Sequence, residues 1–186
     1  MNKIAFLTTI YPVDDLYIID FFESLIGQTN SKFDVIIAND GFSDLDELKN
    51  KYHSLNIIEL PVFDSIAKNR ELLIKYAIDC GYTYAIFGDI DDYFDTNRVE
   101  TSKSLLQTYD IVVNDLTSFS SKKILLEKCI SNRIPNQTEI ALDFIMDKNI
   151  FGLSNTAIRL EELVSEHISF PSKLIAVDWF FFTNLL

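Results

Sequence analysis

The chain is 186 residues long, the usual size of one domain that can bury a sizeable core. Its 48% hydrophobic and 13% aromatic residues exclude a disordered chain, and a net charge of −12 with no Lys or Arg cluster argues against nucleic acid as a partner. No apolar run reaches the ~18 residues that a membrane span needs, so we expect no transmembrane segment.

The first hundred residues alternate short apolar runs with segments of helical periodicity. Each apolar run ends in a polar turn or a proline, and each helical segment begins after an Asp or Ser that can cap it. This alternation predicts an α/β fold with a mainly parallel sheet and helices on both faces. We expect strands at 4–7, 33–38, 56–60 and 82–87, and helices capped by Asp14 or Asp15, by Ser43 or Asp44, and by Ser65.

The second half of the chain is less regular, and residues 116–150 mix strand and helix signals. The aromatic run at 179–182 would leave a large apolar surface on the last helix. We therefore expect either a truncated chain or a partner that covers this surface. The other predicted elements are strands at 109–113 and 151–158 and helices at 159–166 and 177–186.

The two cysteines, Cys80 and Cys129, are far apart and form no Cys-x-x-Cys pair, which argues against a zinc site or a disulfide framework. We interpret both as buried thiols in a reducing cytoplasm. His53 and His167 have no partner at metal-ligand spacing, and we expect both on the surface.

Polar residues, most of them acidic, follow two of the predicted strands. Asn39 and Asp40 come after the second, and Asp89, Asp91 and Asp92 come after the fourth. Ligands of open α/β sheets bind at the carboxyl ends of the strands, so these groups are expected to converge. Residues i and i+2 of an extended strand end face the same side, which makes Asp89 and Asp91 candidate ligands for Mg²⁺ or Mn²⁺. The alternative is that the aspartates only form turns and cap helices.

Five segments, in order, resemble motifs of the family 2 glycosyltransferases, which have a GT-A fold. The resemblance covers essentially the whole chain and is densest over residues 4–100. The order and spacing of the five together are more specific than any one motif. The segments are 24–29 (similar to Ser-Leu-x-x-Gln-Thr), 35–44 (a strand and an Asp-Gly-Ser turn), 67–69 (Ala-Arg-Asn), 87–92 with 97–100 (an Asp-x-Asp-Asp block) and 177–179 (Glu-Asp-Trp).

The resemblance implies one Rossmann-like GT-A catalytic domain over 1–186, truncated at its C-terminus, with a nucleotide-binding half (1–100) and an acceptor-side half (101–186). It implies a metal-dependent (Mn²⁺ or Mg²⁺), inverting glycosyltransferase of polysaccharide or glycoconjugate synthesis. The sugar would pass from a nucleotide-diphosphate donor, with UDP-sugars the first candidates, to a hydroxyl of an acceptor sugar or glycolipid. The protein would be cytoplasmic, or held at the inner face of the membrane through a further C-terminal part. By position, Asp178 would be the general base, Thr9, Tyr11, Asp40, Lys68 and Asp89 would contact the nucleotide, and Asp91 with Asp89 would bind the metal.

Two departures from the family pattern leave other interpretations open. Glu71 stands where the family has a glycine, and Val177 stands where it has the Glu before the base. The second departure motivates one alternative, a non-catalytic relative that binds nucleotide sugar. Another alternative is a Mg²⁺-binding signalling domain with a flavodoxin-like sheet, although Thr8 and Thr9 stand where such domains carry an acidic pair.

Overall fold

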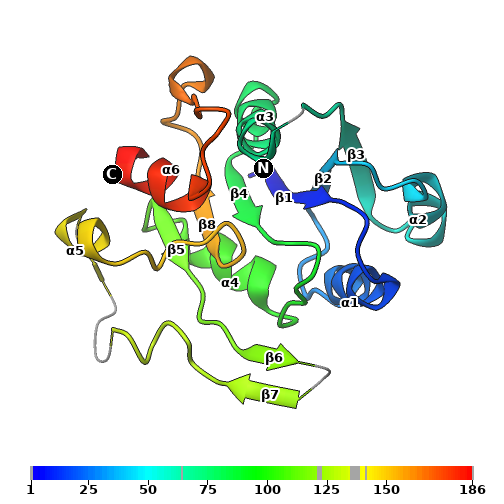
Figure 1. Cartoon of the computed structure of the whole chain (residues 1–186), viewed down its shortest axis with the longest axis horizontal. Helices are drawn as coiled ribbons and strands as arrows, with labels where there is room; N and C mark the ends of the chain where they lie inside the picture. The colour runs from blue at the N-terminus through cyan, green and yellow to red at the C-terminus, as the bar shows by residue number, and fades with distance from the viewer. Residues whose placement is uncertain (1, 64, 121–122, 135–138, 141, 186) are drawn as a thin grey trace.

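The computed structural model describes residues 2–63, 65–120, 123–134, 139–140 and 142–185. Its strands are β1 (Ile4–Ile10), β2 (Asp34–Asn39), β3 (Asn56–Leu60), β4 (Tyr84–Phe87), β5 (Ile111–Val113), β6 (Ser118–Ser120), β7 (Lys123–Leu126) and β8 (Thr156–Arg159). Six of them form one sheet in the order β3-β2-β1-β4-β8-β5, and β6 and β7 form a separate hairpin (Figure 1).

The large sheet is mainly parallel, as predicted. β1 pairs in parallel with both β2 and β4, and β2 pairs in parallel with β3. β8 pairs antiparallel with β4 and with β5, so it is the one reversed strand of the six. The four parallel strands therefore end together at one edge of the sheet.

Helices cover both faces of the sheet (Figure 1). Alternate residues of β1 point to opposite faces: Phe6 packs in one core with Phe21, and Leu7 packs in the other with Ile74. The core that contains Phe6 holds residues of α1 (Asp15–Ile26), α2 (Leu45–Lys51) and α4 (Arg98–Leu105). The core that contains Leu7 holds residues of α3 (Ile66–Asp79), α5 (Leu142–Asp147) and α6 (Val177–Leu185).

Among the described residues, no helix is long and apolar enough to cross a bilayer.

The helix starts follow the predicted capping residues. Asp14 accepts a hydrogen bond from the N–H of Leu16 (2.9 Å) at the start of α1, and Ser65 accepts one from the N–H of Lys68 (3.5 Å) at the start of α3. These two caps satisfy backbone donors that would otherwise lack partners, so the local sequence fixes where both helices begin.

The predicted strand at 151–158 is wrong in extent, and the predicted helix at 159–166 is wrong in type. Only the end of the first range is strand, because the side chain of Asn155 holds the preceding residues in a turn by accepting the N–H three residues earlier (2.7 Å). The second range begins inside β8. Leu160 is buried and donates its N–H to the carbonyl of Thr83 (2.9 Å), so the chain stays extended there. A 3₁₀ turn, η1 (Ser165–His167), is the only helical part of that range.

The interpretation of both cysteines as buried thiols is also wrong. Cys80 is exposed because it is the residue at which α3 ends, and Cys129 is only half-buried. His53 and His167 are exposed, as predicted.

The aromatic run on α6 is mostly packed inside the protein. Phe181 and Phe182 are buried, and their rings meet Phe87 at centroid distances of 6.5 Å and 6.4 Å. Phe180 is half-buried, and Trp179 donates its indole N–H to the carbonyl of Ile145 (2.9 Å). Two of the four aromatic side chains are therefore in the core, whereas Trp179 stays 38% exposed.

Candidate functional site

The turns after β2 and β4 both bond to β1 near its end. The N–H of Asp40 donates to the carbonyl of Ile10 (2.7 Å), and the N–H of Gly88 donates to the carbonyl of Leu7 (3.1 Å). Tyr11 follows β1 directly. The parallel sheet thus brings the two acidic turns to either side of one strand end, which is where ligands bind in open α/β sheets.

The turn after β4 gathers three carboxylates. Ile90 is fully buried and anchors the turn, and the N–H of Asp92 donates to the carbonyl of Asp89 (3.1 Å). Asp91 is exposed, whereas Asp89 and Asp92 are half-buried. Burial, and then the charges of Asp89 and Asp91, raise the pKa of Asp92 to about 6. The three carboxylates are therefore close enough to repel one another, and a bound cation would relieve that repulsion.

Gly88 is required by the packing under this turn. A Cβ atom at this position would lie 2.6 Å from Cζ of Phe94 and 2.7 Å from Cε1 of Phe6. Gly88→Ala is expected to cost about 1–3 kcal/mol of unfolding free energy, because both rings are buried and can move little. Urea denaturation measures this loss. Gly27→Ala is the control: its Cβ would meet its nearest neighbour at 3.4 Å, so a loss as large there would contradict the packing argument.

A buried arginine bonds to the last residue of β4, directly before the turn. Arg98 donates an Nη2 hydrogen bond to the carbonyl of Phe87, and its guanidinium lies 4.5 Å from the ring centroid of Phe94. Burial lowers its pKa to about 10, so it stays charged at neutral pH, and its charge lowers the pKa of Asp92. Arg98 therefore partly offsets the negative charge of the turn.

A second arginine, Arg70 on α3, forms an ion pair with Asp89. Burial and then the carboxylates of Asp91 and Asp89 raise the pKa of Tyr11, while the charge of Arg70 lowers it. These interactions place Tyr11, Arg70 and the acidic turn in one neighbourhood. Sequence reasoning missed Arg70, although its position next to the Ala-Lys-Asn segment, in the first turns of a capped helix, was a usable signal.

The other residues predicted to contact a nucleotide are Thr9, Asp40 and Lys68, which differ in burial and in their bonding partners. Thr9 is only 7% exposed, and its hydroxyl has no hydrogen-bond partner among the described residues. Asp40 is exposed at the turn after β2. Lys68 forms an ion pair with Glu71 (2.6 Å) in the same helix. The Thr9 hydroxyl is thus buried without a described partner, whereas Lys68 already has a carboxylate partner.

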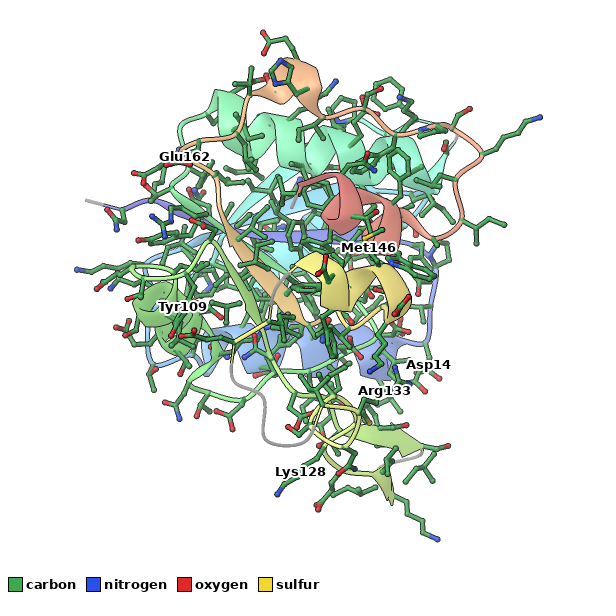
Figure 2. All side chains as sticks on the ribbon, turned by 90° about the vertical axis from the view of Figure 1, so that its left-hand side faces the viewer. Asp14, Tyr109, Lys128, Arg133, Met146 and Glu162 are labelled. Atoms are coloured by element: carbon green, nitrogen blue, oxygen red, sulfur yellow. The ribbon has the colours of Figure 1, made fainter. Side chains whose placement is uncertain are left out.

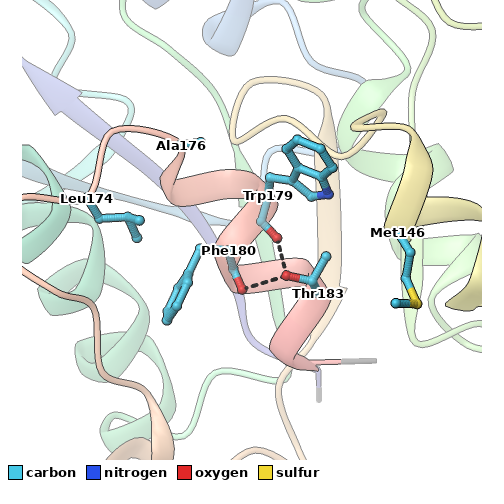
Figure 3. A pocket seen from close by; sticks show the side chains of 6 residues that line it. All are labelled: Met146, Leu174, Ala176, Trp179, Phe180 and Thr183. Atoms are coloured by element: carbon cyan, nitrogen blue, oxygen red, sulfur yellow. Dashed lines mark hydrogen bonds between the residues drawn. The ribbon is translucent and has the colours of Figure 1, made fainter.

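Asp178 begins a separate contact network at the start of α6. Its Oδ1 accepts the N–H of Trp179 (2.8 Å) and its Oδ2 accepts the amide of Asn149 (3.2 Å). A cavity of about 570 Å³ lies beside Trp179, and Figure 3 shows the side chains that line it: Met146, Leu174, Ala176, Trp179, Phe180 and Thr183. Within the described part of the chain, no hydrogen bond or ion pair joins Asp178 to the acidic turn.

The acidic turn offers a suitable donor set for a hard cation, but not a complete site. The described residues contain no group of three or more His, Cys, Asp or Glu placed to hold a metal ion. Mg²⁺ and related ions that act with diphosphates need only one or two protein carboxylates, with the phosphates as further ligands. Asp91 is the exposed carboxylate of the turn, and Asp89 is shared with Arg70. These two oxygen donors fit a cation that arrives with a diphosphate.

The chain has a GT-A-like fold, shown by its likeness to solved glycosyltransferase structures. It matches S. aureus TarS 1–349 with a TM-score of 0.73 and 19% identity over 96% of this chain and 53% of that one. The same protein in complex with UDP-GlcNAc gives a TM-score of 0.73, with 20% identity over 96% of this chain and 52% of that chain. The mannosyltransferase PcManGT from Pyrobaculum calidifontis, in complex with GDP-Man and Mn²⁺, gives 0.62, with 11% identity over 95% of this chain and 49% of that chain.

The chain spans about half the length of these structures. By sequence, no protein-family model matches it, and no curated protein does.

Proposed function

We propose that the protein is a metal-dependent glycosyltransferase that takes its sugar from a nucleoside-diphosphate donor. The observation that carries this proposal is the acidic turn of Asp89, Asp91 and Asp92, which lies beside Tyr11 at the carboxyl edge of a GT-A-like sheet. The two similar proteins were solved with nucleotide sugars, and one of them with Mn²⁺. A nucleotide sugar and a divalent cation are therefore the ligands that fit this edge best.

The chain's own residues would divide the work at the donor end. Asp91, with Asp89, would hold the cation, which neutralises charge on the diphosphate leaving group when it is bound. Arg70 would orient Asp89 through their ion pair. Tyr11 would contact the nucleoside, because it is exposed directly after β1. Thr9 would support the same strand end, where its buried hydroxyl has no hydrogen-bond partner among the described residues.

Asp178 would act at the acceptor end as general base. A carboxylate offers about four acceptor positions, and the described bonds from Trp179 and Asn149 use two of them. The remaining positions can take a proton from an acceptor hydroxyl as that oxygen attacks the anomeric carbon. A single displacement of this kind inverts the configuration of the sugar.

Asp91→Ala is expected to abolish metal-dependent nucleotide binding. Calorimetric titration of UDP, GDP and dTDP, with and without Mn²⁺, measures this on wild type and variant. One nucleotide should bind the wild type at micromolar affinity only with the metal, because the exposed Asp91 carboxylate supplies an oxygen ligand.

Asp79→Ala is the matched control, since Asp79 is an exposed aspartate at the far end of α3. It should bind nucleotide as the wild type does. Unchanged metal-dependent binding by Asp91→Ala would show that Asp91 does not hold the metal. If the wild type bound no nucleotide, the proposed function would fail and only the GT-A-like fold would remain.

A second candidate function is a non-catalytic protein that binds nucleotide sugar. It is favoured by Val177 in place of the Glu before the base, and by Lys68, whose ammonium is already paired with Glu71. Release of nucleotide from a UDP-sugar by the purified protein, in transfer or in hydrolysis, would exclude this candidate.

A further inference from the structure

The β6–β7 hairpin stands apart from the large sheet. It forms its own two-stranded sheet, and Figure 2 shows it projecting from the body of the protein, with Lys128 and Arg133 labelled close to it. A two-stranded hairpin has little stability alone. Contact between the rings of Phe119 and Tyr93, at a centroid distance of 5.1 Å, ties its inner side to the segment that follows the acidic turn. The hairpin is thus attached to the candidate site.

The outer strand of this hairpin exposes three successive apolar side chains. Ile124, Leu125 and Leu126 are 54%, 61% and 52% exposed. The pairing register slips at this point, since Ser118 faces Leu126 while Phe119 faces Ile124, which leaves Leu125 as the extra residue of a bulge. A bulge disrupts the regular alternation of side chains between the two faces of a strand. The three side chains therefore stay outside the core, although Ile124 also lines a cavity that it shares with Asp92 and Phe119.

The charge of this region is opposite to that of the rest of the protein. Residues 115–134 hold four basic residues and two acidic residues, Asp115 and Glu127, in a chain with 16 basic and 28 acidic residues. Lys123 and Lys128 flank the apolar run on either side and are both exposed. An exposed aliphatic stretch of β7 between lysines matches the interface of an anionic bilayer, where apolar side chains enter the acyl boundary and ammonium groups meet headgroup phosphates.

We propose that the β6–β7 hairpin docks the protein onto an anionic lipid surface, with Leu125 and Leu126 in the interface and Lys123 and Lys128 at the headgroups. The remainder of the chain is net acidic and is repelled by the same surface, which favours approach by the hairpin end. The Phe119–Tyr93 contact would then hold the acidic turn close to the membrane. The proposal does not depend on the function proposed above.

Vesicle co-sedimentation tests the docking. Wild-type protein should sediment with phosphatidylcholine vesicles that contain phosphatidylglycerol, and not with pure phosphatidylcholine vesicles. Raising NaCl from about 0.1 M to about 0.5 M should release it, because the Debye length shortens. Leu125→Ser with Leu126→Ser, and separately Lys123→Glu with Lys128→Glu, should each weaken binding about tenfold or more, since all four side chains are exposed.

Leu16→Ser is the control, because Leu16 is 59% exposed on α1 but has Asp14 and Asp15 beside it. It should bind vesicles as the wild type does, and circular dichroism should show all variants folded. Wild-type protein that stays in the supernatant with both vesicle types would overturn the proposal. So would hairpin variants that bind vesicles normally, or that lose only self-association in sedimentation velocity, since the hairpin would then dock a second copy.

Discussion

Asp178→Asn is expected to lower the rate of sugar transfer by about 10²- to 10⁴-fold, the usual contribution of a general base. Donor binding should stay close to the wild-type level, because the described contacts of Asp178 are with Trp179 and Asn149 and not with the acidic turn. Asparagine keeps the shape of the side chain and can still accept the N–H of Trp179. Product release from a UDP-sugar measures the rate, and calorimetry measures the donor affinity.

Asp147→Asn is the matched control for this variant. Asp147 is an exposed aspartate at the end of α5, the helix that packs against α6, so its change should leave the rate unaffected. Transfer at the wild-type rate by Asp178→Asn would remove Asp178 from the mechanism. Asn149→Ala is expected to have a smaller effect than Asp178→Asn, because it removes one bond that orients the carboxylate.

The first hundred residues could be predicted well because their signals are local. Ser65 and Asp14 cap helices where the sequence places them, and the predicted strands are all present with ends shifted by a few residues. A parallel βα pattern also fixes which ends of the strands meet, so the neighbourhood of Asp40 and the acidic turn could be inferred without coordinates.

The structure of the second half of the chain and the support of the acidic turn depend on contacts between residues that are distant in sequence. The side chain of Asn155 holds the residues before β8 in a turn, so the strand begins only at Thr156. Leu160 stays extended because its N–H bonds to the carbonyl of Thr83. The ion pair of Arg70 with Asp89 joins residues from α3 and the turn after β4. Neither the hydrophobic period nor the local propensity of a segment carries such information, so the second half of the chain and the support of the site could not be predicted.

Glu71 shows how one departure from the family pattern is accommodated. The side chain is only 8% exposed; Oε2 accepts the N–H of Phe170 (2.7 Å) and the ammonium of Lys68 (2.6 Å), and Oε1 pairs with Lys75 (2.9 Å). Ser65 adds a second tie by donating to the carbonyl of Ser172 (2.6 Å). The start of α3 is thus bonded to the loop that leads into α6 and Asp178.

Glu71→Ala is expected to lower the unfolding free energy by about 2–4 kcal/mol, because it leaves the N–H of Phe170 buried without its acceptor and two lysines without a counter-charge. This loss is smaller than that expected for a fully buried ion pair, because both lysine side chains are about one-third exposed. Urea denaturation at neutral pH measures the loss.

The stabilising effect of Glu71 should also disappear in acid. Burial alone raises its pKa, but the hydrogen bonds from Lys68, the Phe170 N–H and Lys75 outweigh burial and hold the pKa below its usual value. A lowered pKa in the folded state means that the contribution is complete above the unfolded pKa, about 4.3, and is lost as the pH falls through the folded value. Glu71→Gln should therefore be less stable than wild type at pH 7, and the difference should shrink below about pH 4.

Glu59→Gln is the control for both measurements, because Glu59 also pairs with a lysine, Lys49 (2.7 Å), but lies at the surface. Exposed pairs contribute about 0–1 kcal/mol, so this change should barely move the denaturation midpoint. Equal losses at Glu59 and Glu71 would mean that burial and the bond to Phe170 add nothing. A larger loss at Glu71, accompanied by slower transfer with normal donor affinity, would show that the carboxylate in place of glycine helps to position the helix that carries Asp178.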